Sequence, residues 1–262
     1  MECVYGFTNE NVASYQRLYN LDQKDILSVL GSGDQYFTAV LNGAENVDLF
    51  DINEYAWLYF VLKRAVIANF NYDKFYRFLV IDKLNNPNLY QEIRKSLPPY
   101  VQTFFDNLVA RKIKLSSILI DTKVFDVQNN AKDDKIIPYF DPKKYYKLQT
   151  ILQNKKMPKF YHGNLTTLYN KIKKEKKSDQ VHYDLMFLSN IYHYLNMDLS
   201  EFKDMLTQFD CPTFQAMYYW FLNKDELQEY QNLGFFIDAV HTAANMTNRT
   251  HDYVLTLNKK NR

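Results

Sequence analysis

The sequence predicts a three-layer α/β domain in which about seven strands alternate with helices. Short apolar runs without sustained polar alternation recur along the chain, as expected for strands buried on both faces of a sheet. Apolar residues at helical spacing separate most of these runs. The last two runs, at residues 235–240 and 252–257, are predicted to close the domain as two strands that form an antiparallel pair.

The composition fits one globular domain. The chain has 262 residues, of which 47% are apolar and 24% are charged, and its net charge is +2. A chain of this length can bury one large core, and so small a charge does not by itself indicate a nucleic-acid partner. Aromatic residues are abundant, with 22 Tyr and 19 Phe. Either an AT-rich coding sequence or a functional aromatic surface accounts for them.

The chain carries no predicted secretion or membrane signal. Residues 1–11 are polar and lack a basic start, and the apolar stretch at 55–70 is interrupted by Lys63 and Arg64. Cys3 and Cys211 are far apart and have no metal-ligand or redox neighbour at a useful spacing. We therefore expect a soluble cytoplasmic protein with two free thiols.

The first elements form one β-turn-α-β unit of about 30 residues. After helical spacing within residues 9–20, the pattern predicts a strand at 25–30, a helix at 35–41 and a strand at 46–50.

A long helix at 54–69 follows, and no strand is predicted before about residue 158. Because one helix normally suffices to connect neighbouring strands, residues 70–158 are predicted to be an inserted helical cap within a single domain spanning 1–262. Within it we expect helices at 72–84 and 99–110 and a loop at 121–142.

The alternation of strands and helices then resumes. The pattern predicts strands at 159–163, 183–188 and 213–221, and helices from 165, at 201–209 and at 225–232.

Two turns of the first unit indicate a nucleoside site. Gly31 and Gly33 follow the first strand, where glycines let the backbone pass close to a ligand. Asp51 ends the second strand about 20 residues later, the position from which a carboxylate can bind both ribose hydroxyls. The carboxyl ends of parallel strands share one edge, so these residues should meet there.

The same turn favours S-adenosylmethionine (SAM) over a dinucleotide. Position 36 is Tyr, where a dinucleotide site has its third Gly. Asp34 would repel a pyrophosphate and attract the cationic amino group of SAM. The alternative is a plain tight turn in which Asp34 only caps the following helix.

The residues at 26–34 and 47–53 resemble the first two motifs of class I SAM-dependent methyltransferases. Their G-S-G-D and F-D-I-N forms are more similar to a bacterial group related to the DUF3419 and BtaA-like proteins. The resemblance is specific over 25–53, loose over 159–257 and absent over 70–158. It implies a Rossmann-like class I methyltransferase fold with a helical insertion, and SAM as cofactor.

The resemblance also implies roles for individual residues. The methionine end of SAM would be held by Gly31, Ser32, Gly33 and Asp34, the ribose by Asp51, and the adenine by Ile52, Asn53, Asn164 and Leu165. Asn164 could equally be a plain helix cap. Past the fourth strand, the candidate catalytic residues are Ser189, Asn190 and His193, although a structural role for His193 stays open.

Several other sequence features bear on the kind of reaction and on possible partners. Residues 189–192 lack the two prolines of DNA amino-methyltransferases, and Cys211 precedes Pro212, the reverse of the order used for cytosine C5 chemistry. The histidines, at 162, 182, 193, 241 and 251, form no metal-binding pair, so no metal site is expected. The basic run at 171–177, with other lysines between 132 and 159, is either a solvated helix face or a patch for nucleic acid or anionic lipid.

The sequence thus predicts a SAM-dependent transferase, first a methyltransferase, acting on an acceptor that it does not identify. Two alternatives stay open: a SAM-dependent 3-amino-3-carboxypropyl transferase, and a non-catalytic SAM-binding sensor or interaction module. The oligomeric state is not predicted.

Overall fold

The computed structural model describes residues 3–120, 136–177, 180–219, 224–241 and 252–258. Most of the loop predicted at 121–142 lies outside these residues, as do Lys132, Lys135 and His251. Among the described residues, no helix is long and apolar enough to cross a bilayer, and no group of three His, Cys, Asp or Glu side chains could hold a metal ion.

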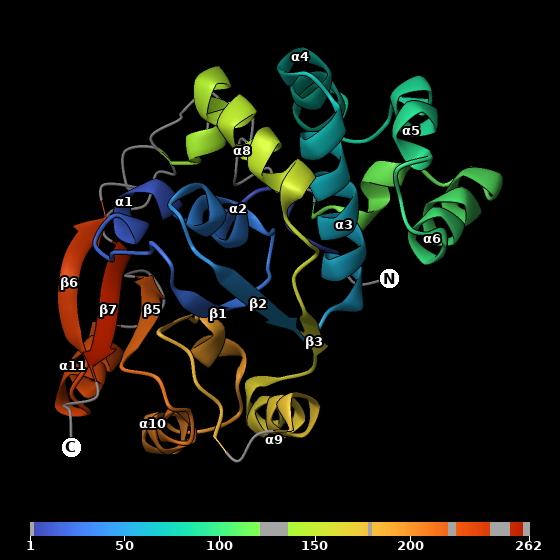
Figure 1. Cartoon of the computed structure of the whole chain (residues 1–262). Coiled ribbons are helices and arrows are strands. Elements are labelled where there is room, and N and C mark those ends of the chain that lie inside the picture. The colour runs from blue at the N-terminus through green and yellow to red at the C-terminus, as the bar shows by residue number, and fades with distance from the viewer. Residues whose placement is uncertain (1–2, 121–135, 178–179, 220–223, 242–251, 259–262) are drawn as a thin grey trace.

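A seven-stranded mixed sheet forms the centre of the molecule (Figure 1). Its order is β3-β2-β1-β4-β5-β7-β6, and β7 runs antiparallel to both β5 and β6. The predicted α/β fold with an antiparallel C-terminal pair is therefore confirmed. The strands are β1 (Asp25–Val29), β2 (Asn46–Asp51), β3 (Phe160–His162), β4 (Leu185–Phe187), β5 (Thr213–Tyr219), β6 (Phe236–His241) and β7 (Asp252–Asn258).

Helices cover both faces of the sheet (Figure 1). One face carries α1 (Val12–Gln16), α2 (Asp34–Leu41), α3 (Glu54–Asn69) and α8 (Pro142–Asn154). The other carries α9 (Leu165–Lys176), α10 (Leu199–Thr207) and α11 (Lys224–Asn232). The alternation of side chains along each strand separates two cores: Ile26 and Leu30 join the first, and Leu27 joins the second.

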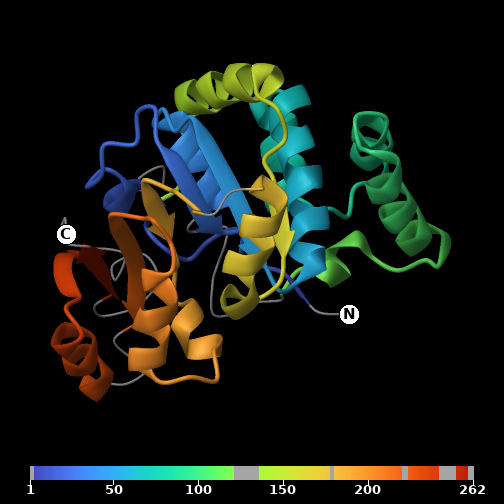
Figure 2. The ribbon, with the colours of Figure 1, turned by 60° about the horizontal axis from the view of Figure 1, so that its bottom comes forward.

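The segment between α3 and β3 divides into two parts. Two of its helices, α5 (Pro87–Arg94) and α6 (Pro99–Ala110), extend beyond the edge of the sheet, whereas α8 packs against α2 and α3 (Figures 1 and 2). Shorter elements connect them: α4 (Tyr72–Phe75), a π-helical turn η1 (Tyr76–Ile81), and the 3₁₀ turns η2 (Leu115–Ile118) and η3 (Pro138–Phe140). Part of the predicted insertion therefore belongs to the helical layer itself.

Candidate ligand-binding site

The parallel register brings the predicted site residues to one edge of the sheet. Val29 pairs with Phe50, Ser28 with Phe187, and Asp51 with His162. The segments that follow β1, β2, β3 and β4 therefore leave the sheet side by side. They contain the predicted residues at 31–34, 51–53, 164–165 and 189–193.

The turn after β1 depends on its two glycines in different ways. Both have left-handed backbone angles, with φ of +49° at Gly31 and +84° at Gly33. A Cβ at Gly33 would lie 2.7 Å from Cδ2 of Phe60, so this position also lacks room for a side chain. At Gly31, apart from the glycine itself and its two chain neighbours, no heavy atom of the described residues lies within 4 Å of the corresponding point. Gly31 thus faces open space at the edge, where a ligand can approach the backbone.

Asp34 does not present a free charge at this edge. Its side chain is fully buried and forms an ion pair of 2.6 Å with the equally buried Lys63 of α3. It also accepts hydrogen bonds from the Thr8 amide (2.5 Å), the Ser32 hydroxyl (2.7 Å) and the Tyr139 hydroxyl. The expected attraction of a cationic ligand to Asp34 therefore loses its electrostatic basis, because an internal cation already pairs with this carboxylate.

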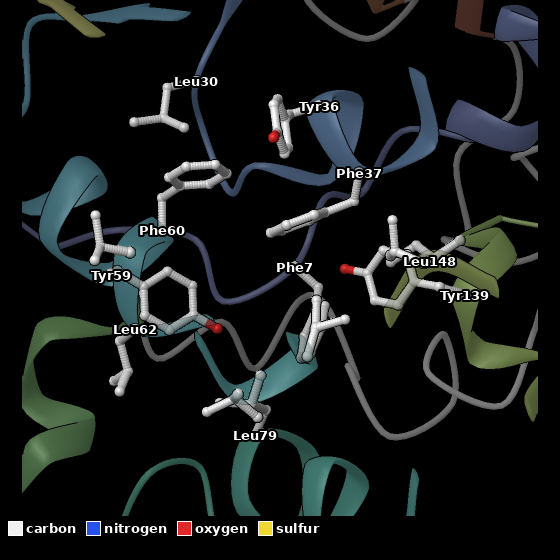
Figure 3. Packing of buried hydrophobic residues seen from close by; sticks show 14 of the residues in the cluster. Phe7, Leu30, Tyr36, Phe37, Tyr59, Phe60, Leu62, Leu79, Tyr139 and Leu148 are labelled. Atoms are coloured by element: carbon white, nitrogen blue, oxygen red, sulfur yellow. The ribbon is translucent and has the colours of Figure 1, made fainter. Parts of the chain in front are cut away.

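Lys63 is satisfied within the protein. Besides Asp34, its Nζ donates to the carbonyls of Gly6 (3.0 Å) and Ser32 (3.1 Å). Four aromatic rings lie within 6.0 Å of Nζ, and Figure 3 shows how they face one another: Phe7, Phe37, Tyr59 and Tyr139.

Burial changes the acid–base properties of this group of side chains. It lowers the pKa of Lys63, against the opposing effect of Asp34. It raises the pKa of Tyr59 and Tyr139 well above the ordinary value, and the charge of Asp34 adds to both shifts. Both tyrosines are therefore neutral hydrogen-bond donors.

Asp51 has a different environment at the end of β2. It is partly exposed, and its two oxygens accept the backbone amides of Gly31 (3.0 Å) and Asn53 (2.9 Å). Burial raises its pKa, and these backbone hydrogen bonds oppose the shift. Each carboxylate oxygen retains acceptor capacity for a further hydrogen bond.

Next to Asp51, Ile52 leaves an apolar side chain 61% exposed. Asn53 caps α3 by accepting the Tyr55 amide (2.9 Å). The Nε2 atom of His162 lies 2.9 Å from the Ile52 carbonyl oxygen, so the end of β3 holds the turn after β2.

The residues after β3 have structural partners. Asn164 caps α9 by accepting the Thr167 amide (3.2 Å), and its oxygen also accepts the hydroxyls of Thr166 (2.6 Å) and Thr167 (3.1 Å). Leu165 is 1% exposed and belongs to the second core. The helix-cap alternative for Asn164 is thus what the structure shows, and an adenine contact by Leu165 would need a side chain that the core already covers.

The segment after β4 meets an acidic residue that the sequence did not single out. Ser189 has a left-handed backbone (φ +51°), and its hydroxyl donates to Oε1 of Glu10. Asn190 begins a 3₁₀ turn, η4 (Ile191–Tyr194), whose His193 amide donates to the Asn190 carbonyl (3.2 Å).

Sequence reasoning missed Glu10, Tyr139 and the role of Lys63. Glu10 and Tyr139 lie 179 and 105 residues from their partners Ser189 and Asp34, so no spacing signal links them. Lys63 did give a signal. It lies within the longest apolar stretch of the sequence, and a buried lysine requires a buried partner.

The lysines of the predicted basic patch have several local partners. Lys155 donates to the carbonyls of Ala44 (3.2 Å) and Glu45 (2.6 Å). Lys176 lies 3.6 Å from Asp48 and 4.0 Å from the centre of the Tyr183 ring. Part of this charge thus serves the fold.

No protein-family model and no curated protein matches the sequence. Solved structures do resemble it. The magnesium protoporphyrin IX methyltransferase of Synechocystis, solved with bound SAM, has a TM-score of 0.42 and 11% identity over 95% of this chain and 76% of that one. The rRNA methyltransferase aviRa of Streptomyces viridochromogenes has a TM-score of 0.43 and 8% identity, covering 96% and 85%.

At such low identity and TM-score, these likenesses say nothing about the activity of this chain, and the fold is described from its own topology. The strand order and the antiparallel β7, with helices on both faces, define a Rossmann-like fold of the class I methyltransferase type.

Proposed function

We propose that this chain is a SAM-dependent transferase, and specifically a methyltransferase. The supporting observation is the hydrogen bond between the Gly31 amide and Asp51 (3.0 Å), which joins the turns after β1 and β2 at the carboxyl edge of the sheet. Open α/β sheets bind their ligands at this edge. A carboxylate for the ribose and an open glycine for the methionine portion then lie side by side.

The residues present fit SAM at this place. Gly31 and Gly33 would hold the methionine portion, Asp51 the ribose hydroxyls, and the exposed Ile52 would cover the adenine. The role of Asp34 and Ser32 in this proposal is to fix the turn, since Lys63 neutralises Asp34. When bound, SAM supplies an activated methyl group on its sulfonium.

Ser189, Asn190 and His193 lie at the neighbouring strand end, where an acceptor would approach. Asn190 and His193 would orient the acceptor nucleophile and hold its proton. Orientation supplies much of the rate in a reaction between two bound groups. The described residues at this strand end do not indicate the chemical class of the acceptor.

Calorimetric titration with SAM and S-adenosylhomocysteine tests the proposal. Asp51→Ala should weaken binding about 10- to 100-fold, because it removes a charged hydrogen-bond acceptor. Gly31→Val should abolish binding by placing a side chain in the open space at the turn. Asp204→Ala, which removes an exposed carboxylate on α10, is the matched control and should bind as the wild type does.

Wild-type affinity in both site variants would rule out the proposed site. In turnover assays, S-adenosylhomocysteine as product identifies methyl transfer, and methylthioadenosine identifies transfer of the aminocarboxypropyl group.

A further inference from the structure

The N-terminal segment before α1 lies against the edge of the sheet that carries the candidate site. It begins with a hydrogen bond from the Val4 amide to the Ile118 carbonyl (2.7 Å) and is fixed to the turn after β1 by the Thr8 amide on Asp34. The segment ends at Glu10, which is only 2% exposed. It thereby places a buried acid at the candidate site.

Within the described part of the chain, two helices and the turn after β4 donate hydrogen bonds to the Glu10 carboxylate. Oε2 accepts hydrogen bonds from the hydroxyl of Tyr15 on α1 (3.2 Å) and from the side-chain Nε2 of Gln35 on α2 (3.2 Å). Oε1 accepts the hydroxyl of Ser189, which follows β4. An ionised carboxylate only accepts, so this set of donors suits the charged form.

This acid joins the segments that follow β1 and β4, through Gln35 and Ser189. Along the sheet, β2 and β3 lie on one side of β1, and β4 and β5 lie on the other. The strand order therefore reverses at β1 and β4, which is the place where ligands of open α/β sheets bind.

Glu10 determines what Ser189 can offer to a ligand. A serine hydroxyl has one proton to donate and two lone pairs. The Oδ1 atom of Asn190 is a more distant acceptor at 3.3 Å, so the proton goes to Glu10. Ser189 is partly exposed, whereas Glu10 is buried. The backbone of Ser189 is held by the Met217 amide (2.8 Å), so the hydroxyl oxygen presents lone pairs in a fixed position, supported by a negative charge.

We propose that Ser189, positioned by Glu10, accepts a hydrogen bond from the α-ammonium group of the methionine portion of SAM. This inference rests on the proposed function. With the ribose on Asp51 at the end of β2, the rest of the ligand runs across β1 towards β4, where Ser189 lies. Ser189, positioned by Glu10, thus binds the cationic amino group of SAM in place of Asp34, because Asp34 is already paired with Lys63.

Comparing ligands with and without the α-ammonium group distinguishes a direct contact by Ser189 from a purely structural role. S-adenosylhomocysteine carries the α-ammonium group, and 5′-methylthioadenosine lacks the whole aminocarboxypropyl group. By calorimetry, Ser189→Ala and Glu10→Gln should each weaken S-adenosylhomocysteine binding about tenfold while changing methylthioadenosine binding less than about twofold. Decarboxylated SAM, which retains the amine, should lose affinity as S-adenosylhomocysteine does.

Matched controls are Ser200→Ala on α10 and Glu229→Gln on α11, both at exposed positions, which should leave both affinities unchanged. An equal loss for both ligands in the site variants would show a merely structural role and overturn the inference. Unchanged affinity for both would overturn it as well. If the wild-type protein binds neither ligand, the proposed function itself fails. Circular dichroism checks folding, and should Glu10→Gln not fold, Ser189→Ala decides alone.

Discussion

The turns after β1 and β2 each carry an aspartate at the same edge of the sheet, yet their environments are opposite. Asp34 is fully buried and paired with Lys63, whereas Asp51 is partly exposed and bonded to backbone amides. The first holds its turn together, and the second remains available to a ligand. The formal charge of a turn therefore does not give the charge that a ligand meets, because a lysine 29 residues away neutralises one of the two.

The largest expected effect concerns the buried pair. Lys63→Met replaces the lysine with an unbranched apolar side chain of similar length, and it leaves Asp34 buried without its cation. Breaking a buried ion pair in this way should lower the free energy of unfolding by about 3–5 kcal/mol. Urea denaturation followed by circular dichroism measures it.

The double variant Asp34→Asn with Lys63→Met should recover part of this loss, since no uncompensated charge stays buried. Asp51→Asn is the comparison at the other turn and should change stability far less. A loss below about 1 kcal/mol for Lys63→Met would show that the pair does not hold the turn.

A smaller effect distinguishes the two glycines of the first turn. Gly33→Ala must fit a Cβ 2.7 Å from Phe60 and adopt a left-handed backbone, so it should cost about 2–4 kcal/mol. Gly31→Ala meets no such contact and should cost only the backbone term of about 1–2 kcal/mol. Thermal unfolding of the two variants gives the order directly, and the reverse order would contradict this account of the turn.

The smallest expected effect is the pH dependence of Asp51. Burial raises its pKa in the folded state, so its contribution to stability is full below the unfolded pKa and is lost as pH rises through the folded value. As pH rises through that window, the free energy of unfolding of the wild type should therefore fall relative to that of Asp51→Asn. Denaturation at a series of mildly acidic pH values measures it. A constant difference would show that folding does not change the pKa.

Local signals in the sequence predicted much of the fold. The bounds expected for α3 match the structure, because Asn53 caps its start and most of the following residues are apolar. The sheet prediction succeeded because buried parallel strands are short apolar runs. By contrast, α5 and α8 were missed, although each begins with an Asx cap followed by proline, at Asn86 and Asp141.

The candidate site also has a part that the sequence predicts and a part that it does not. Gly31, Asp51 and Ser189 lie at one edge of the sheet because β1, β2 and β4 are parallel, and the alternation of strands with helices predicts such parallel strands. The contacts of Glu10 with Ser189 and of Tyr139 with Asp34 depend on the tertiary path of the N-terminal segment and of η3. Nothing local in the sequence fixes those paths.

The Asp34–Lys63 pair constrains how the sequence can evolve. Either residue alone would be a buried charge without compensation, so a substitution at one position creates selection at the other. Positions 34 and 63 should therefore have changed together among homologous sequences, as acid with base or as two neutral residues. Asp51 instead accepts hydrogen bonds from the backbone amides of Gly31 and Asn53, so variation at position 51 should follow the ligand.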